Sequence, residues 1–294
     1  MILVSGAGGK TGLALLRQLA HKGISARALV RREEQVEQAV ACGAAEARVG
    51  DLLDPRSMAP AFQGLAAVYH IPPNMHPQEE AIAENVLHLA KESAAGHFVY
   101  HSVLRPYIRA MPHHINKARV EERLYAANLP FTIVQPAAYM QNTLPGLRSA
   151  GEEGVYRVPY PIETRLGMVD LEEVAEVAAS IIANPAHFGA TYELAGSEVL
   201  TPFQVAEQMS AALGKPIRAS EIELEAWKDQ AAQSGLSRYS IETLLKMFRY
   251  YAEHGFWGNP HTLTTLLGRP PKTYAQFLAS QDLAPFRAKD DGSS

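Results

Sequence analysis

A glycine-rich segment near the N-terminus constrains the fold of this chain more than any other sequence feature. The apolar run Ile2–Val4 is followed closely by Gly6-Ala7-Gly8-Gly9-Lys10-Thr11-Gly12, and an amphipathic stretch of helical length covers Lys10–His21. Glycines at these spacings let the backbone turn tightly and approach a pyrophosphate, while the helix N-terminus offers its N–H groups to the phosphates. The order strand, glycine loop and helix therefore predicts a dinucleotide-binding site rather than an ordinary glycine-rich turn.

Short apolar runs and amphipathic stretches continue to alternate as far as Pro136. A helix is expected from about His113 to Ala127, before the last of these runs. Such alternation is typical of βαβ units, whose right-handed crossovers give a doubly wound parallel sheet of the Rossmann type, with ligands beyond the carboxyl ends of the strands. After the first strand, the expected strands are Ala26–Val30, Arg48–Val49, Ala67–Ile71, Phe98–Ser102 and Phe131–Gln135.

The alternation changes after Pro136. A helix over 171–183 and a strand over 191–195 still fit the sheet, but 201–213 and most of the chain after Lys215 are mainly helical in pattern. The sequence therefore predicts an NADP-binding Rossmann domain over 1–150, to which 166–198 return. A smaller, mainly helical C-terminal substrate lobe comprises 151–165 and 199–285. The polar tail 286–294 is expected to be disordered.

Composition excludes several classes of protein. The 27 basic and 31 acidic residues give a formal net charge of -4 and are spread evenly, which is unlike a nucleic-acid-binding face or a polybasic membrane patch. The single cysteine, Cys42, forms no intrachain disulfide, and no Cys/His set has metal-ligand spacing. No stretch is apolar enough for a signal peptide or a membrane span. We expect a cytoplasmic protein with a small-molecule partner and no metal.

Arg31 and Arg32 follow the second expected strand, where a NAD-selective Rossmann domain carries an acid for the ribose 2′-hydroxyl. A guanidinium there pairs bidentately with a 2′-phosphate, so NADP(H) is favoured over NAD(H). The alternative is a solvated pair of surface arginines. Asp51, with Leu52 beside it, follows the third strand and would lie beside the adenine, although an acid at this point equally caps a turn or helix.

With these residues in place, the chain resembles the NmrA-like branch of the atypical short-chain dehydrogenase/reductases over roughly residues 1–285. The resemblance implies an extended Rossmann domain that binds NADP(H), a smaller C-terminal lobe, and a cleft for nicotinamide and substrate. The segments that carry it, besides the glycine loop, are Val30-Arg31, Gly50-Asp51, Gln135–Asn142, Val169-Asp170, Val174-Ala175, and Thr191–Gly196 followed by Leu200-Thr201.

The candidate catalytic residues lie around the helix that begins near residue 112. Ordinary short-chain reductases carry a Tyr and, four residues later, a Lys; here Lys117 is present, but His113 replaces the Tyr and His114 follows it. The resemblance implies that Lys117 contacts the nicotinamide ribose, and His113 or His114 would act near the substrate as proton donor, although a His pair at a helix start is often only a cap and a surface residue. Ser102 ends the fifth strand, where such reductases place a Ser or Thr; an ordinary turn-closing hydroxyl is the alternative.

Further contacts are expected from segments that follow the strands. Tyr139 suits either the cleft or packing between lobes, and Phe256 with Trp257 suits either a lid over an aromatic substrate or a homodimer contact. The expected cofactor contacts beyond the glycine loop, Arg31, Asp51, Leu52 and Lys117 are His70, Ile71, Pro72, Pro136 and Tyr139, and the expected substrate contacts are Tyr139, Met140, Asn142, Phe256 and Trp257.

Two functions of different class follow from this pattern. The first is an NADPH-dependent oxidoreductase that transfers hydride to a carbonyl, quinone or conjugated aromatic small molecule. The second is a non-catalytic NADP(H)-sensing regulator, which the missing Tyr favours. The retained Lys117, Ser102 and histidines favour the oxidoreductase, because a sensor needs no proton donor beside the nicotinamide. No Gly-x-Ser-x-Gly or His-Glu-x-x-His motif supports a hydrolase or metalloenzyme.

Overall fold

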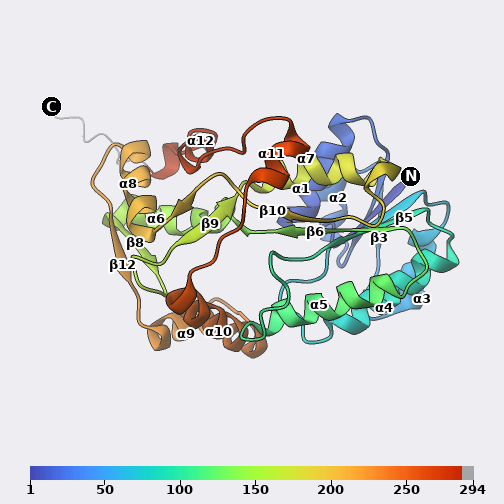
Figure 1. Ribbon diagram of the computed structural model, residues 1–294, viewed down its shortest axis with the longest axis horizontal. Coiled ribbons are helices and arrows are strands. Elements are labelled where there is room, and N and C mark those ends of the chain that lie inside the picture. The colour runs from blue at the N-terminus through green and yellow to red at the C-terminus, as the bar shows by residue number, and fades with distance from the viewer. Residues whose placement is uncertain (287–294) are drawn as a thin grey trace. The chain divides into compact units, whose positions relative to one another are not determined.

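The computed structural model describes residues 1–286, and the chain divides into two compact units. The first unit comprises 1–136, 171–194 and 265–268 and contains a seven-stranded parallel sheet of order β10-β6-β5-β4-β1-β2-β3 (Figure 1). The order reverses between β1 and β4, which places a ligand crevice at their carboxyl ends. The predicted doubly wound parallel sheet is confirmed. Its strands are β1 (Ile2–Ser5), β2 (Ala26–Val30), β3 (Glu46–Val49), β4 (Ala67–His70), β5 (His97–His101), β6 (Phe131–Pro136) and β10 (Thr191–Leu194).

Helices cover both faces of this sheet (Figure 1). Helices α1 and α7 pack against each other on one face, and α4 packs against α5 on the other. The helices of the first unit are α1 (Lys10–His21), α2 (Glu34–Ala41), α3 (Pro55–Met58), α4 (Glu79–Glu92), α5 (Pro112–Tyr125) and α7 (Leu171–Ile182), with the short 3-10 turns η1 (Ala59–Phe62) and η3 (Pro185–His187).

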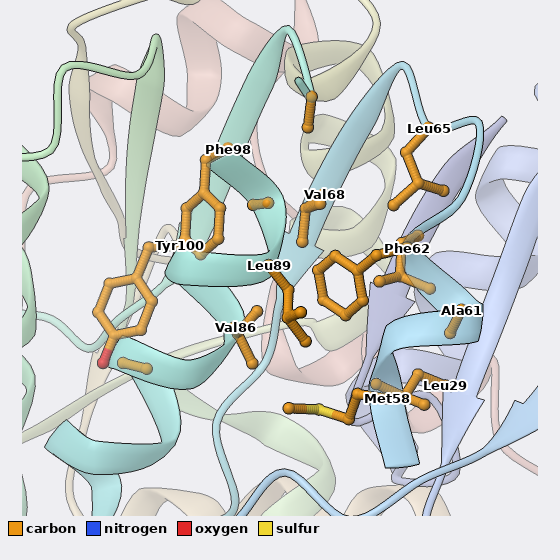
Figure 2. Packing of buried hydrophobic residues seen from close by; sticks show 14 of the residues in the cluster. Leu29, Met58, Ala61, Phe62, Leu65, Val68, Val86, Leu89, Phe98 and Tyr100 are labelled. Carbon is orange, nitrogen blue, oxygen red and sulfur yellow. The ribbon is translucent and has the colours of Figure 1, made fainter. Parts of the chain in front are cut away.

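The core between the sheet and α4 consists of side chains at helical and strand spacing (Figure 2). On α4, Val86 and Leu89 are buried three residues apart, and on β5 Phe98 and Tyr100 point to the same face because strand side chains alternate. Burying each of these apolar side chains contributes about 1.5–3 kcal/mol. This cluster joins α4 and β5 to one hydrophobic core.

The second unit comprises 137–170, 195–264 and the described residues from 269 onward. It holds two short sheets, of orders β11-β9-β7 and β12-β8, that the sequence pattern did not reveal, because strands of two to four residues carry little alternation. Its strands are β7 (Ala138–Tyr139), β8 (Val155–Val158), β9 (Leu166–Val169), β11 (Val199–Leu200) and β12 (Arg218–Glu221); its helices are η2 (Met140–Thr143), α6 (Leu144–Glu153), α8 (Pro202–Leu213), α9 (Leu224–Gln233), α10 (Arg238–His254), α11 (His261–Leu267, shared with the first unit), α12 (Tyr274–Ala279) and η4 (Ala284–Phe286).

The unit boundary falls after Pro136, rather than at residue 150 as the sequence pattern predicts. The reason is that Ala138 already pairs with β9 of the second unit, so the chain changes unit as soon as β6 ends. Of the predicted tail 286–294, only Phe286 is described, and the rest lies outside the described residues. Within residues 1–286, none of the helices has the length and apolarity needed to cross a membrane.

Candidate functional site

The glycine loop joins β1 to α1 and is tightly enclosed at two positions. Gly6 has a φ of 65°, and a Cβ there would lie 2.5 Å from the Ile71 carbonyl oxygen. A Cβ on Gly12 would lie 2.5 Å from Cα of Ala7. A side chain at either position would therefore force the loop apart, whereas a Cβ on Gly9 would make only an ordinary contact, 3.6 Å from the Gly6 carbonyl oxygen. Gly6 thus lets the loop lie close to Ile71, at the start of the segment that follows β4, and Gly12 lets the start of α1 lie close to Ala7.

The N-terminus of α1 is open to an anion. Gly9 provides no side-chain cap, and no acidic residue stands in the first turn of this helix. Lys10 is exposed and Thr11 is half-buried at the same end. Because the first N–H groups of a helix lack intrahelical acceptors and carry a partial positive charge, this end is suited to a phosphate. The loop and helix therefore fit the pyrophosphate of a dinucleotide.

Gln35, on α2, links the glycine loop to the arginine pair, and its role was not predicted from the sequence. Its Oε1 accepts from the backbone N–H groups of Arg31 and Arg32 at 3.2 and 3.1 Å. Its amide nitrogen lies 2.4 Å from the position that a Cβ on Gly8 would take, so Gly8 leaves room for the Gln35 side chain. The sequence gives little indication of this role, because a Gln near the start of a helix is common at protein surfaces.

The two arginines differ in their partners. Arg32 is exposed and forms an ion pair with Glu34 at 2.7 Å. Arg31 is also exposed, and within residues 1–286 no carboxylate forms an ion pair with it. A guanidinium without a carboxylate partner is the group that a 2′-phosphate requires. The geometry thus distinguishes Arg31 from its neighbour.

Asp51 closes a turn after β3. Its Oδ1 accepts from the Leu53 N–H at 2.9 Å, which is the turn-capping arrangement that the sequence left open as an alternative. Leu52 packs against the core cluster, and its carbonyl accepts from Asn85 at 3.0 Å. These contacts give both residues a structural role at the end of β3.

His70 lies at the carboxyl end of β4 and is fully buried. Its Nδ1 lies 2.7 Å from Oγ of Ser5, at the end of the neighbouring β1, while its Nε2 has no partner among the described residues. Burial lowers the pKa of His70 to about 3, so the ring is neutral. Ile71 and Pro72 follow it and are also buried. The carbonyl oxygen of Ile71 is the atom nearest to the position that a Cβ on Gly6 would take, and Cβ of Ile71 is next.

His113 and His114 form the first turn of α5 and are buried, with 6% and 1% of their surfaces exposed. Burial lowers the pKa of His113 to about 2 and that of His114 to about 4, so both rings are neutral near pH 7. His114 Nδ1 donates to the Arg105 carbonyl oxygen at 3.1 Å, because a carbonyl only accepts. Nδ1 of His113 is buried without a partner in the described part of the chain. Neither histidine is therefore a surface residue.

Lys117 projects from the next turn of α5 to a buried carboxylate. Its Nζ lies 2.6 Å from Oε1 of Glu79, the first residue of α4, and the same oxygen accepts from the Tyr100 hydroxyl of β5 at 2.9 Å. Burial, together with the adjacent Glu79, raises the pKa of Tyr100 well above its ordinary value, so this hydroxyl keeps its proton. Glu79 was not identified from the sequence, where it reads as an ordinary acid at a helix start.

Ser102, at the end of β5, donates to a second carboxylate on α5. Oε1 of Glu121 accepts a hydrogen bond from the Ser102 hydroxyl, and the Gln135 amide donates to both Glu121 oxygens at 2.9 and 3.0 Å. Burial raises the pKa of Glu121, against the opposing effect of these two hydrogen bonds. The Ser102 hydroxyl is thus held toward α5.

The residues expected to contact substrate belong mainly to the second unit. Tyr139 is half-buried, Asn142 is exposed, and Met140 is buried. Phe256 is 2% exposed and its ring stacks on Tyr251 at 5.1 Å, which makes it a core residue.

Trp257 is half-buried, and the Arg165 guanidinium lies 5.4 Å from the centre of its ring. Pro136 ends β6 in the first unit, where its carbonyl accepts from the Leu104 N–H at 2.9 Å. Of the two aromatic residues expected to contact substrate, Trp257 is therefore the accessible one, whereas Phe256 is buried.

Comparison with known proteins connects this geometry to a family. The model of the NmrA-like family matches residues 1–270. A NAD(P)H azoreductase of Xenophilus azovorans is 27% identical over 286 residues, covering 97% of this chain and 99% of the relative. A (4-alkanoyl-5-oxo-2,5-dihydrofuran-3-yl)methyl phosphate reductase of Streptomyces griseus is 29% identical over 291 residues, covering 95% of this chain and 97% of the relative.

A solved structure shows the same fold. An NADPH-dependent quinone oxidoreductase from Escherichia coli, in complex with NADPH, superposes with a TM-score of 0.83 at 23% identity, covering 95% of this chain and 99% of that chain. The likeness extends over nearly all of both chains and confirms the predicted Rossmann architecture.

Proposed function

The chain belongs to the NmrA-like family, and we propose that it is an NADPH-dependent reductase that transfers hydride to a carbonyl, quinone or conjugated aromatic small molecule. Two relatives that match along their whole length are named as reductases, one of them as a NAD(P)H azoreductase. An azo group, a quinone and a conjugated carbonyl share one property, since each accepts a hydride at an electron-poor centre and a proton at a heteroatom.

The observation that carries the proposal is an anion site with two parts. The uncapped N-terminus of α1 suits a pyrophosphate, and Arg31, which no carboxylate neutralises within residues 1–286, suits a 2′-phosphate. The Gln35 side chain accepts a hydrogen bond from the backbone N–H of Arg31 and also lies against Gly8. It therefore holds the arginine segment next to the glycine loop. This combination favours NADP(H) over NAD(H).

NADPH supplies the hydride when it is bound. The chain's own residues bind and orient the cofactor: Lys117, in the first unit, contacts the nicotinamide ribose. Such orientation accounts for much of the rate enhancement in hydride transfer, because the reacting centres must approach closely and in line.

A proton must also reach the reduced substrate, and His113 is the better donor of the two histidines. A neutral imidazole carries one N–H. In His114 that N–H is Nδ1–H, which is used by the Arg105 carbonyl. His113 has no such commitment at Nδ1. We therefore assign proton donation to the neutral ring of His113, with Ser102 restrained by Glu121 and hence in a supporting position.

Nucleotide binding and turnover test the proposal together. The purified chain is titrated with NADPH and with NADH, and oxidation of NADPH is then followed against a panel of azo dyes, quinones, aromatic ketones and conjugated enones. Tighter binding of NADPH with turnover on the panel supports the reductase. Tight binding of NADPH without turnover favours the NADP(H)-sensing regulator, and lack of binding of either nucleotide contradicts both.

The cellular compartment and the oligomeric state are part of the same proposal. We assign the reaction to the cytoplasm, since the one cysteine, Cys42, leaves the fold independent of an oxidising compartment. A homodimer through the aromatic C-terminal segment would use the exposed part of Trp257, because Phe256 is inside its own unit. Sedimentation of the purified chain measures this directly.

A further inference from the structure

We propose that Glu79 is the positioning residue for Lys117: a fully buried carboxylate that holds the lysine ammonium in the orientation needed for the nicotinamide ribose. This inference rests on the proposed function, in which Lys117 contacts the cofactor. The Glu79–Lys117 pair joins the first residue of α4 to the second turn of α5.

Burial and pairing distinguish Glu79 from a chance surface acid. The side chain of Glu79 is 0% exposed and that of Lys117 is 12% exposed. Removing a carboxylate from water is costly unless a cation and hydrogen-bond donors compensate, and here Lys117 and the Tyr100 hydroxyl supply them. The N-terminus of α4 adds a partial positive charge on the same side.

Both donors to Glu79 converge on one of its oxygens. Lys117 Nζ lies 2.6 Å and the Tyr100 hydroxyl 2.9 Å from Oε1, while Oε2 has no partner among residues 1–286. Tyr100 belongs to the rigid packed cluster on β5 (Figure 2). The ring of Tyr100 and the start of α4 therefore fix Oε1, and Oε1 in turn fixes the end of the lysine side chain.

The bond to Glu79 leaves Lys117 able to bind a ligand. A lysine ammonium has three N–H donors, and within the described residues Glu79 is its one hydrogen-bond partner. Two donors therefore remain for ribose hydroxyls. A free lysine would lose the motion of its four-carbon stem on binding, so a lysine that is already held binds the ribose with a smaller entropic cost.

The neighbouring Glu80 offers a matched control. It also lies in the first turn of α4 and also pairs with α5, through Arg119 at 2.9 Å and Arg123 at 3.1 Å. These pairs lie at the surface and do not involve Lys117. Glu80→Gln therefore removes a link between the same two helices without changing the lysine.

The experiment measures dissociation constants of Glu79→Gln for two ligands, NADPH and adenosine 2′,5′-bisphosphate, which has the 2′-phosphate but no nicotinamide ribose. We expect NADPH to bind about tenfold more weakly and the bisphosphate to bind within about twofold of the wild type. A general loss of structure would weaken both ligands. Glu80→Gln is expected to leave both constants unchanged.

A double-mutant cycle then tests whether Glu79 acts through the lysine. In a Lys117→Met background, Glu79→Gln is expected to change NADPH affinity by less than about twofold, because its target is gone. The proposal is overturned if Glu79→Gln binds NADPH as well as or more tightly than the wild type, if both ligands weaken equally, or if its effect persists without Lys117.

Tyr100→Phe keeps the proposal testable should Glu79→Gln fail to fold. It removes one donor to Oε1 and leaves the ion pair, so we expect NADPH to bind about threefold more weakly with an unchanged constant for the bisphosphate. Unchanged affinity for NADPH in this variant counts against the proposal. Failure of the wild type to bind NADPH would instead refute the proposed function itself, and this inference with it.

Discussion

Oγ of Ser5 and Nδ1 of His70 lie 2.7 Å apart at the carboxyl ends of two adjacent strands, β1 and β4. These strands flank the point where the order of the sheet reverses, so the pair is at the ligand-facing end of the parallel sheet. The histidine ring stacks on Tyr100, whose hydroxyl binds Glu79. The glycine loop and the lysine region are thus joined by one continuous set of buried polar groups.

Acid should destabilise this protein through its buried histidines. Burial lowers the pKa values of His70 and His101 to about 3, of His113 to about 2 and of His114 to about 4, against an unfolded value of 6.5. The unfolded chain therefore binds more protons below pH 6.5, and stability is lost as the pH falls from that value toward the folded pKa values. From pH 7 to 5, each histidine should lower the free energy of unfolding by about 2 kcal/mol.

Urea unfolding at pH 7 and at pH 5 measures this loss. His114→Gln should reduce the difference between the two pH values, whereas His88→Gln, at an exposed site on α4, should not. Equal pH dependence in wild type and His114→Gln would contradict the assignment of a neutral, buried ring.

Arg31→Ala should reduce the preference for NADPH over NADH. Within residues 1–286 no carboxylate forms an ion pair with its guanidinium, so its removal should weaken NADPH binding about tenfold or more and leave NADH binding nearly unchanged. Fluorescence titrations with both nucleotides measure the two constants. Arg32→Ala is the matched control, because Glu34 already pairs with that residue. Equal effects of the two substitutions would remove the distinction between the arginines.

Gly12→Ala should destabilise the fold as well as the cofactor site. The added Cβ would lie 2.5 Å from Cα of Ala7 and 2.6 Å from the Gly6 carbonyl oxygen, both backbone atoms that cannot move aside alone. We expect a loss of about 2 kcal/mol or more in unfolding free energy.

Gly9→Ala is the control, since the nearest atom there is 3.6 Å away; its stability should stay within about 0.5 kcal/mol of the wild type. Thermal denaturation compares the variants. A similar melting temperature for both variants would mean that the loop has more room than the structure shows.

His113→Ala should lower kcat by about two to four orders of magnitude if the ring donates the proton. His114→Gln should have a smaller effect, because its N–H is already bonded to Arg105. Since burial lowers the pKa values of both rings to about 4 or less, kcat should show no histidine titration between pH 5 and 9. Steady-state assays over this range, with the substrate found active in the panel, check both statements. Undiminished turnover in His113→Ala would mean that another group donates the proton.

Glu79→Gln should lower the free energy of unfolding in the wild type but raise it in a Lys117→Met background. Lys117→Met leaves the buried carboxylate without its cation and should cost about 3–5 kcal/mol. Adding Glu79→Gln in that background removes the uncompensated charge and should restore part of the loss, although the same substitution destabilises the wild type. Urea unfolding of the four proteins gives the comparison. Additive losses would mean that the two side chains are not coupled.

The sequence alone determined the parallel sheet and the glycine loop and indicated the arginine pair Arg31 and Arg32, because each of these features follows from the local order of residues along the chain. The tertiary structure then distinguished Arg31 from Arg32 through the ion pair of Arg32 with Glu34. Alternation of strand and helix reports which segments are buried, and Gly6 and Gly12 report a turn that only glycine permits. Strand boundaries came within two residues, as at Glu46–Val49, where the expected run began at Arg48.

Only the tertiary structure decided which partners these residues have. Glu79, Tyr100 and Lys117 come from a helix, a strand and a second helix, and the lysine and its carboxylate lie 38 positions apart in the chain. Periodicity assigns a side chain to a face of its element but says nothing about which charge it meets there. Phe256 shows the same limit, since an aromatic residue in a glycine-flanked turn suits a lid or a core equally until its stacking on Tyr251 is seen. Pairing depends on how crossovers bring distant elements together, and that is a property of the folded chain rather than of any segment of it.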